Sequence, residues 1–336
     1  MAYYGYYPMN NITNKKLGRA LVYGGLFIAG ALTGWIFFRM TTDISSNSSN
    51  GVRQSGYTFI SPLLECDVAD GQTTKPLRSL QNDLEEYSDS VIASSSVDHI
   101  SIYLRDLNNG PWIGVYEEEV FTPASLLKVP VMMTYFRAAE SDPDLLDEKL
   151  TYQPETPPSE TATLKSGESY SIDQLIKYMI RDSDNDAFSL LVSHIDNDLV
   201  NKTLIDLGLT VPDASTPENY ITVRSYASLF RVLYNASYLS RDMSERALEL
   251  LSSTSYDDGL RAGIGDEVIV ASKFGIRGNQ NNTDRQLHDC GIVYYPDHPY
   301  LICVMTRGSE IGELATTIAN ISKRIFDFHQ EAYPVE

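Results

Sequence analysis

The sequence predicts an α/β protein of the α+β type. One five-stranded antiparallel sheet carries helices against it, and an all-helical subdomain is inserted between the strands. Two observations lead to this class. Segments that alternate apolar and polar residues lie near both ends of the folded part, and helical spacing fills the middle. Strands from both ends can bury their apolar faces in one sheet, so the helices between them must form an insertion.

The amino-terminal part predicts a membrane anchor. The run that begins at Ala20 and ends at Phe38 has no charged residue, and as a helix it would be about 28 Å long, close to a bilayer core. Lys15, Lys16 and Arg19 precede it, so the amino terminus is expected in the cytoplasm and the rest outside. A cleaved signal peptide is the alternative, but the run is long and no clear cleavage site follows. We therefore expect a single-pass membrane protein with the lipid bilayer as a partner.

Composition divides the chain into four parts. The first residues are rich in Tyr, Asn and Gly, and a stretch rich in Ser, Asn and Thr follows the apolar run, so both are expected to be flexible. With 43% hydrophobic and 21% charged residues, the rest is expected to form a normal core. The expected parts are a cytoplasmic disordered tail (1–16), a transmembrane helix (17–39), a flexible linker (40–56) and a folded domain (57–336).

The folded part begins with a helix and a hairpin. Apolar residues recur at helical spacing over 77–93, and residues 99–107 alternate as a half-buried strand does. After a turn, residues 112–121 form the second strand of the expected hairpin. Thr122 and Pro123 then occupy the cap and first-turn positions of the next helix.

The remaining elements are a helical block, three strands and a closing helix. The expected helices of the block are 171–180, 186–195, 198–208, 223–234 and 244–253. The expected strands are 267–275, 287–295 and 300–308, and the closing helix is 311–328.

Charge and cysteine spacing exclude several classes of function. The formal net charge of −19 repels phosphate backbones, so nucleic-acid binding is not expected. No cysteine spacing typical of zinc sites and no glycine-rich phosphate loop occurs, so neither a metal nor a nucleotide cofactor is expected.

The cysteine pairing stays open at this point. Cys290 and Cys303 lie on two strands of an expected hairpin, and if Tyr295 faces Tyr300 the two cysteines are diagonal, which suits a bridge poorly. A bond between Cys66 and Cys290 is one alternative, and three free buried thiols are the other.

A lysine inside an apolar helix is the first feature that indicates a catalytic site. Lys128 lies between Leu127 and Val129, and Ser125 lies three residues earlier, on the same helix face. Apolar surroundings disfavour the ammonium form and lower the lysine pKa, so Lys128 can act as a base that activates the weakly nucleophilic serine. A serine near a helix start and a lysine that reaches solvent are the structural alternative.

Two further segments complete the pattern. Ser183, Asp184 and Asn185 follow a helix, where Ser183 could relay a proton to a leaving group, Asp184 could hold the turn and Asn185 could bond a substrate carbonyl. A plain helix-capping loop is the alternative for these residues. Lys273 and Gly275 lie on a returning strand, where the lysine could bind a substrate carboxylate and raise the acidity of Ser183, and the glycine would let a substrate backbone lie close.

Together, the order, context and approximate spacing of these three motifs resemble those of the serine penicillin-recognising enzymes, the class A β-lactamases and the D-alanyl-D-alanine peptidases. The resemblance covers roughly residues 77–328. It implies the β-lactamase/transpeptidase-like fold, a monomeric catalytic domain and no cofactor. The substrate it implies is a β-lactam or a D-Ala-D-Ala-type peptide.

The resemblance also implies an acyl-enzyme mechanism. Ser125 would attack an amide or β-lactam carbonyl while Lys128 takes its proton. The oxyanion would lie between the backbone N–H groups of Ser125 and Ile276. Water would then release the acyl group.

Two departures from the family pattern bear on the substrate. Phe274 stands where the family usually has a threonine or serine whose hydroxyl helps to bind a substrate carboxylate, and Arg277 is a candidate to replace it. Glu218 is the single glutamate between Gly208 and Val223, and it is a candidate deacylation base or a turn residue.

Three functions therefore remain open: a class A type β-lactamase, a D-alanyl-D-alanine carboxypeptidase with slow β-lactam turnover, and a non-catalytic surface module that retains the fold.

Overall fold

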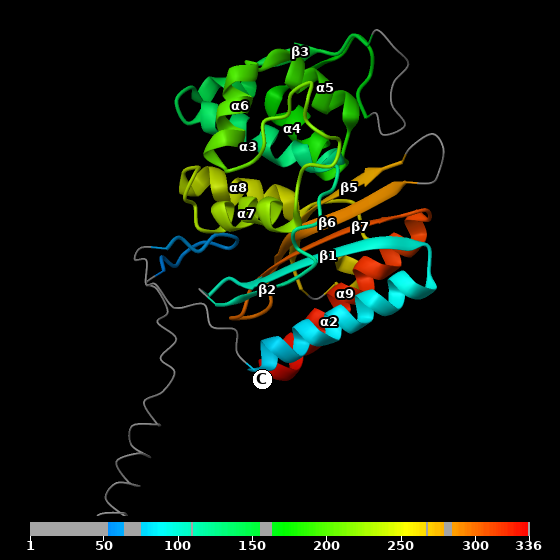
Figure 1. The fold of residues 1–336 in the computed structure, drawn as a ribbon. Coiled ribbons are helices and arrows are strands. Elements are labelled where there is room, and N and C mark those ends of the chain that lie inside the picture. The colour runs from blue at the N-terminus through cyan, green and yellow to red at the C-terminus, as the bar shows by residue number, and fades with distance from the viewer. Residues whose placement is uncertain are drawn as a thin grey trace, which may run out of the picture. The chain divides into compact units, whose positions relative to one another are not determined.

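A five-stranded antiparallel sheet in the order β2-β1-β7-β6-β5 forms the centre of the fold (Figure 1). The computed structural model describes residues 53–63, 75–108, 110–154, 163–266, 268–278 and 284–334. Strands from both ends of the folded part pair in this sheet, which confirms the predicted architecture. The strands are β1 (Val97–Asp106), β2 (Trp112–Val115), β5 (Val270–Arg277), β6 (Arg285–Val293) and β7 (Tyr300–Gly308).

Two long helices cover one face of the sheet. Helix α2 (Lys75–Ser94) packs on β1 and β2, and helix α9 (Ile311–Ala332) packs on β6 and β7 (Figure 1). Alternate strand residues such as Ile100 and Ile302 point to this side, and they share a core with Ile318 of α9. This burial of apolar area holds the terminal helices on the sheet.

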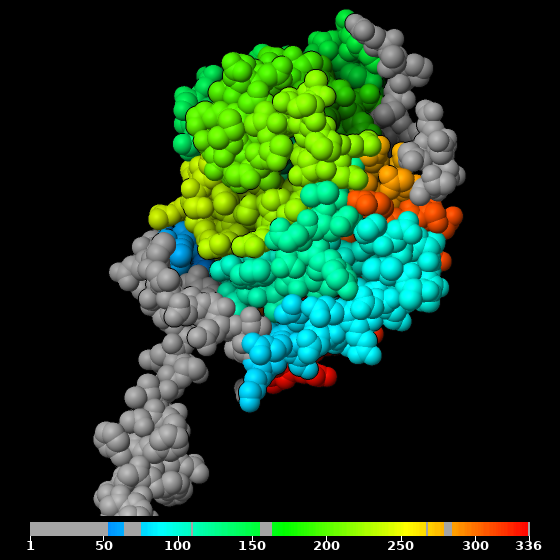
Figure 2. Space-filling view, viewed as in Figure 1, coloured from blue at the N-terminus to red at the C-terminus, as the bar shows by residue number. Residues whose placement is uncertain are grey.

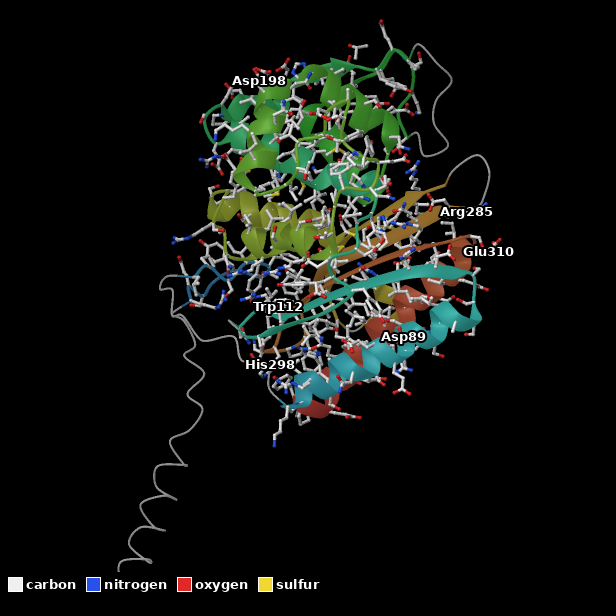
Figure 3. All side chains as sticks on the ribbon, viewed as in Figure 1. Asp89, Trp112, Asp198, Arg285, His298 and Glu310 are labelled. Carbon is white, nitrogen blue, oxygen red and sulfur yellow. A yellow bond between two sulfur atoms is a disulfide. The ribbon has the colours of Figure 1, made fainter. Side chains whose placement is uncertain are left out.

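The other face of the sheet carries the inserted helices. Helix α7 contacts β1, β6 and β7, and helix α8 contacts β5 (Figures 1 and 2). Trp112, labelled in Figure 3, stacks on Tyr103 with ring centroids 5.6 Å apart, and Arg224 of α7 lies over its ring. The helices are α3 (Lys128–Ala139), α4 (Ile172–Arg181), α5 (Asn185–His194), α6 (Asn197–Asp206), α7 (Val223–Tyr234) and α8 (Arg241–Ser252). Shorter elements are η1 (Ala124–Leu127), η2 (Pro143–Asp147), η3 (Arg261–Gly263), β3 (Lys149–Thr151) and β4 (Ser169–Ser171).

Local sequence explains where the inserted helices begin. Ser171 starts α4 with a capping box to Gln174, and Thr222 starts α7 with a capping box to Ser225. In each case two backbone N–H groups of the first turn gain side-chain acceptors, which fixes the helix start and the loop before it.

The segment 53–63 packs against this helical side, beside α7 and α8 in Figure 2. Arg53 donates to the carbonyl oxygens of Ser61 and Leu107 and to Asn235 at the end of α7. The carboxylate of Glu245 on α8 accepts from the backbone N–H groups of residues 58–60. These bonds hold the segment 53–63 on the helical side of the domain.

The expected register of β6 and β7 is wrong. Val293 pairs with Tyr300, so Cys290 lies directly opposite Cys303, and the two form a disulfide. The expected register had Tyr295 opposite Tyr300, two residues out, because the turn residues were counted as strand. This bond rules out both earlier alternatives, Cys66 bound to Cys290 and three free thiols. Cys66 lies outside the described residues.

Two predicted boundaries are also wrong. The second strand ends at Val115, because Tyr116 adopts a left-handed φ of 50° that breaks the extended chain, and only an isolated bridge at Phe121 follows. Helix α3 begins at Lys128 instead of Thr122. Starting there places Pro130 in the first turn, where its missing N–H costs no helical hydrogen bond.

None of the helices in the described part of the chain is long and apolar enough to cross a membrane. The predicted anchor lies outside the described residues.

Candidate active site

A serine hydroxyl between two buried lysines is the centre of the candidate site. Ser183 Oγ lies 3.1 Å from Lys128 Nζ and 3.1 Å from Lys273 Nζ. The three residues come from the start of α3, from the loop between α4 and α5, and from the edge strand β5. The fold thus brings together one residue from each of the three motifs.

Lys128 is held by three hydrogen bonds on the α4–α5 side. Its Nζ donates to the carbonyl oxygen of Ser183 at 2.6 Å, to Ser183 Oγ, and to Asn185 Oδ1 at 2.7 Å. The side chain is buried, and Nζ lies 5.8 Å from the centre of the Phe188 ring. Burial lowers the pKa of Lys128 to about 8, although the negative charge of Asp184 acts in the opposite direction. About a tenth of this lysine is therefore neutral at pH 7, compared with well under a thousandth for an ordinary lysine, so it can serve as a general base.

Lys273 is fully buried on β5. Its Nζ donates to Ser183 Oγ and, at 2.9 Å, to the carbonyl oxygen of Phe274. Burial and the nearby charge of Lys128 lower its pKa well below the ordinary value, and Asp289 opposes them. The two lysines therefore disfavour each other's charged form.

The loop that carries Ser183 is fixed by Asp184. One carboxylate oxygen of Asp184 accepts from the N–H groups of Asp186 and Ala187 and caps α5, and the other accepts from Thr163 N–H. Asp184 holds the turn, as expected. Ser183 itself has a left-handed φ of 53°, a costly conformation for a serine that turns its hydroxyl toward the lysines.

Ser125 lies in the short helix η1, one turn before Lys128, and is partly exposed. Within the described residues its hydroxyl makes no hydrogen bond. Ala124, directly before it, has a left-handed φ of 46°. Only five non-glycine residues with positive φ occur in the described part of the chain, and Ala124 and Ser183 are two of them. Two strained backbone positions therefore lie at the candidate site.

The edge strand β5 lies against the turn of Ser125. A Cβ atom on Gly275 would lie 3.1 Å from Leu126 Cγ and 3.3 Å from the carbonyl oxygen of Pro123, so glycine permits this close approach. Ile276 follows Gly275 and is 43% exposed on the outer strand. The backbone of Ile276 therefore borders the same turn as Ser125.

Arg277 and Glu218 lie together at the end of β5. Their side chains form an ion pair, and Arg277 also donates to Thr122 Oγ1 at 2.9 Å. Glu218 is mostly exposed, and among the described residues it contacts neither Ser125 nor Lys128. The predicted carboxylate-binding role of Arg277 and the predicted base role of Glu218 would both require this pair to separate.

Sequence reasoning missed the surroundings of Phe274. Its ring stacks on Tyr256 with centroids 4.2 Å apart and planes at 19°. Tyr256 lies in the loop after α8, and no spacing in the sequence relates it to Phe274. A polar network of Thr122, Asn219, Gln286 and His288 next to η1 was likewise unpredicted.

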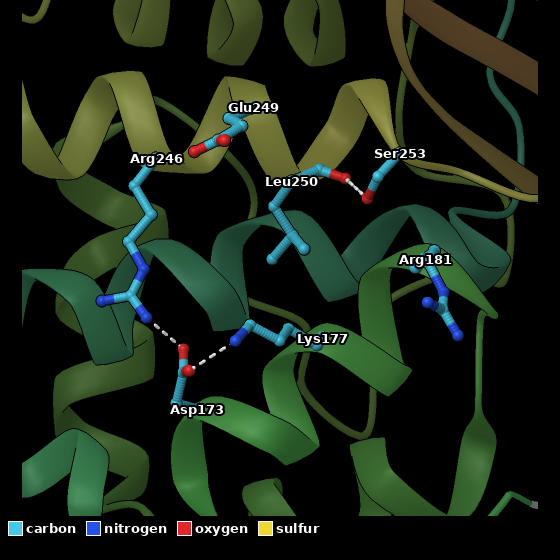
Figure 4. Close-up of a pocket in the computed structure, with 7 residues that line it drawn as sticks. All are labelled: Asp173, Lys177, Arg181, Arg246, Glu249, Leu250 and Ser253. Atoms are coloured by element: carbon cyan, nitrogen blue, oxygen red, sulfur yellow. Dashed lines mark hydrogen bonds and ion pairs between the residues drawn. The ribbon is translucent and has the colours of Figure 1, made fainter.

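A hollow of about 400 Å³ lies elsewhere, between α4 and α8 (Figure 4). Asp173 bridges Lys177 and Arg246 across it, and no predicted site residue lines it. These ion pairs engage three of its five charged side chains, and no serine with a neighbouring lysine lines it, so we assign the chemistry to the lysine cluster instead.

Comparisons with known proteins identify the family and the fold. Residues 82–329 match the model of the beta-lactamase enzyme family. The fold is similar to that of PBP-A, at 22% identity and a TM-score of 0.65 over 77% of this chain and 99% of that chain.

It is also similar to a class A beta-lactamase from Bacteroides cellulosilyticus DSM 14838, at 19% identity and a TM-score of 0.67 over 77% of this chain and 100% of that chain. A variant of PBP-A in an acyl-enzyme complex with penicillin G matches with 22% identity and a TM-score of 0.65, covering 77% of this chain and 99% of that chain. The search of curated proteins found no match.

Proposed function

The chain belongs to the beta-lactamase enzyme family, serine hydrolases that act on amide bonds, and from this premise we propose that it forms an acyl-enzyme at Ser125. The bond cleaved is the amide of a β-lactam, as in class A enzymes, or of a related cell-wall peptide. The observation that carries the proposal is the Ser183 hydroxyl placed 3.1 Å from two buried lysine amines.

Lys128 acts as the base in acylation. An ammonium at this position would use all three N–H donors on Ser183 and Asn185. A neutral amine has only two N–H donors, so it keeps the two shorter bonds and frees a lone pair. That lone pair takes the proton of Ser125 as Oγ bonds to the carbonyl carbon.

Ser183 passes the proton onward. As the carbon–nitrogen bond breaks, the proton moves from Lys128 through Ser183 Oγ to the leaving nitrogen. Lys273, on the other side of the hydroxyl, stabilises negative charge on Ser183 Oγ during the transfer. The backbone N–H groups of Ser125 and Ile276 receive the oxyanion, which the approach of β5 to η1 favours.

The position of Glu218 favours slow release of the acyl group. Its carboxylate is paired with Arg277 and faces solvent, so it is poorly placed to activate water at Ser125. This favours the second candidate function, a D-alanyl-D-alanine carboxypeptidase or cell-wall peptidase. In such an enzyme a β-lactam acylates the serine, and the acyl-enzyme is then hydrolysed slowly.

Intact mass spectrometry tests the function directly. The purified full-length chain is incubated with a fluorescent penicillin, and its mass is followed over time beside Ser125→Ala. A Ser125-dependent adduct supports the proposal: rapid decay indicates a β-lactamase, and a persistent adduct indicates the peptidase type. No adduct with this probe or with an uncharged β-lactam would leave a non-catalytic module that retains the fold.

Membrane anchoring is a separate part of the proposal. The uncharged run between Ala20 and Phe38, with basic residues before it, supports a single-pass protein whose catalytic domain lies outside the cytoplasm. Extraction of membranes at alkaline pH should leave the full chain in the pellet and release a chain that starts at residue 53. Release of both would contradict the anchor.

A further inference from the structure

The aromatic rings of Phe274 and Tyr256 form a stacked pair next to the buried Lys273 of β5. Phe274 follows Lys273, and its ring stacks on Tyr256. Lys273 Nζ lies 4.0 Å from the centre of the Phe274 ring. Both rings are partly exposed, so they present apolar surface next to the reactive cluster. We call Tyr256, Phe274 and Ile276 the apolar wall.

Ile276 extends this surface along the outer strand. It lies two residues after Phe274, on the same face of β5, and is 43% exposed. Between them, Gly275 lets the strand approach the Ser125 turn. Phe274 and Ile276 point to one face of β5, and Lys273 and Gly275 point to the other. Because β5 is an edge strand, a substrate held at Ser125 and aligned along its free edge can contact side chains of both faces, including the wall.

The neighbours of the wall across the sheet carry no positive charge. Asp289 lies opposite Phe274, and the buried Leu287 lies opposite Ile276. Asp289 Oδ2 accepts from Leu260 N–H, and its other oxygen has no partner among the described residues. His288, opposite Gly275, is buried, and its pKa is lowered to about 4 by that burial, so it is neutral.

The nearest basic side chains on β5 are already engaged. Lys273 donates to Ser183 and to its neighbour's carbonyl oxygen, and Arg277 is paired with Glu218 and bonded to Thr122. A substrate carboxylate placed against the wall would lose its hydrating water. It would contact the rings of Tyr256 and Phe274 and lie near the buried carboxyl group of Asp289. Burying an anion without a partner is costly, whereas burying an apolar group is favourable.

We propose that the apolar wall determines specificity, and that the part of the substrate lying along β5 beside Lys273 is uncharged and apolar instead of carrying a free carboxylate. This inference rests on the proposed acyl-enzyme function and narrows its substrate class to neutral amides or β-lactams with an alkyl or aryl flank. Of the two peptidase activities it therefore excludes the carboxypeptidase, whose substrate ends in a free D-Ala carboxylate, and leaves cleavage of cell-wall amides that have no carboxylate beside the scissile bond.

A matched pair of probes tests it: benzylpenicillin and its methyl ester. They share the β-lactam ring, and only the ester lacks the negative charge. In both, Ser125 Oγ bonds to the lactam carbonyl carbon, the ring carbon–nitrogen bond breaks, and the serine proton ends on the ring nitrogen. The second-order rate constant of acylation is measured for each by intact mass, with the full-length chain.

The ester should react about tenfold faster than the acid, or more. Phe274→Thr, which removes the ring and adds a hydroxyl, should lower this ratio by about tenfold or more, while Phe274→Leu should keep it above one. Tyr87→Thr removes a partly exposed ring from α2, which packs on β1 and β2, and should leave the ratio unchanged.

The outcomes separate the two claims. An acid that reacts as fast as the ester, or a ratio that Phe274→Thr does not move, overturns the inference and leaves the acyl-enzyme intact. If neither probe labels Ser125, the proposed function fails and the inference fails with it. If Phe274→Thr does not fold, the ester-to-acid ratio of acylation rate constants in the unaltered protein and in Phe274→Leu still tests the inference. A ratio of one or less in the unaltered protein overturns it.

Discussion

Lys128 Nζ lies 2.6 Å from the carbonyl oxygen of Ser183, so the lysine one turn after the candidate nucleophile is tied to the loop between α4 and α5. The side chain is buried, and its partners are a carbonyl oxygen, a hydroxyl and an amide oxygen, all neutral. This combination explains why the lysine can be positioned firmly and still lose its proton near neutral pH.

The first prediction concerns the pH dependence of acylation. The active form of Lys128 is the neutral amine, and its pKa is about 8. The acylation rate should therefore fall about tenfold per pH unit below about pH 8 and level off above it. Adduct formation followed from about pH 6 to about pH 10 measures this. A profile that is flat or that peaks below about pH 6 would exclude Lys128 as the base.

Lys128→Arg is the matched variant. It keeps a positive charge that does not titrate in this range, so acylation above about pH 8 should drop by about 10²-fold or more, and the rise of the rate with pH should disappear. Loss of this rise separates removal of the base from a mere shift of its pKa.

The second prediction concerns Asp184. Its negative charge raises the pKa of Lys128 against the larger effect of burial, so Asp184→Asn should move the pH profile to lower pH. Asparagine can still cap α5 through its oxygen, but its NH2 group cannot accept from Thr163 N–H, so Asp184→Asn should cost about 1 kcal/mol of stability. Asp184→Ala should shift the profile in the same direction and cost about 1 kcal/mol more through the lost cap.

Thermal unfolding and acylation profiles of both variants check this pair of effects. A profile that stays in place in Asp184→Asn would mean that the carboxylate does not act on Lys128.

The third prediction concerns the disulfide. Cys290 and Cys303 close a short loop between β6 and β7, and such a link stabilises mainly by restricting the unfolded chain. The double variant Cys290→Ala, Cys303→Ala should lower the free energy of unfolding by about 3 kcal/mol. Denaturant unfolding with and without reductant measures it: reductant should lower the stability of the unaltered protein and leave the double variant unchanged. Equal stability throughout would contradict the bond.

The pairing of Cys290 with Cys303 could not be predicted from the sequence, because it depends on the register of β6 and β7. Alternation predicted both strands, but register depends on where the turn begins, and a shift of two residues keeps every side chain on its face. The pattern in the sequence was therefore equally compatible with Cys290 opposite Met305 and with Cys290 opposite Cys303. Only the pairing of Val293 with Tyr300 decides between them.

In the candidate site, too, local spacing predicted some neighbours, whereas contacts made by tertiary packing were not predictable from spacing alone. Ser125 and Lys128 are separated by one turn, so local spacing was enough to relate them. Ser183 and Lys273 could be related to Lys128 only through the family pattern, because tertiary packing brings them together. Tyr256 had no such pattern, and its contact with Phe274 became visible only in the folded chain.

The fourth prediction concerns Glu218. It was a candidate deacylation base, but its carboxylate is largely exposed and paired with Arg277. An exposed ion pair contributes at most about 1 kcal/mol. Glu218→Gln should therefore leave stability nearly unchanged and alter the lifetime of the acyl-enzyme by less than about threefold. Pulse labelling with a fluorescent penicillin, followed by removal of free probe, gives that lifetime.

Arg277→Gln supplies the control for this variant. It frees the Glu218 carboxylate from its partner, and if the glutamate could act as a base, its release should then shorten the lifetime. An acyl-enzyme that persists about tenfold longer in Glu218→Gln would show that the pair separates during turnover and that Glu218 activates water. Unchanged lifetimes in both variants would instead exclude Glu218 as the base, in agreement with the lack, among the described residues, of a carboxylate bonded near Ser125.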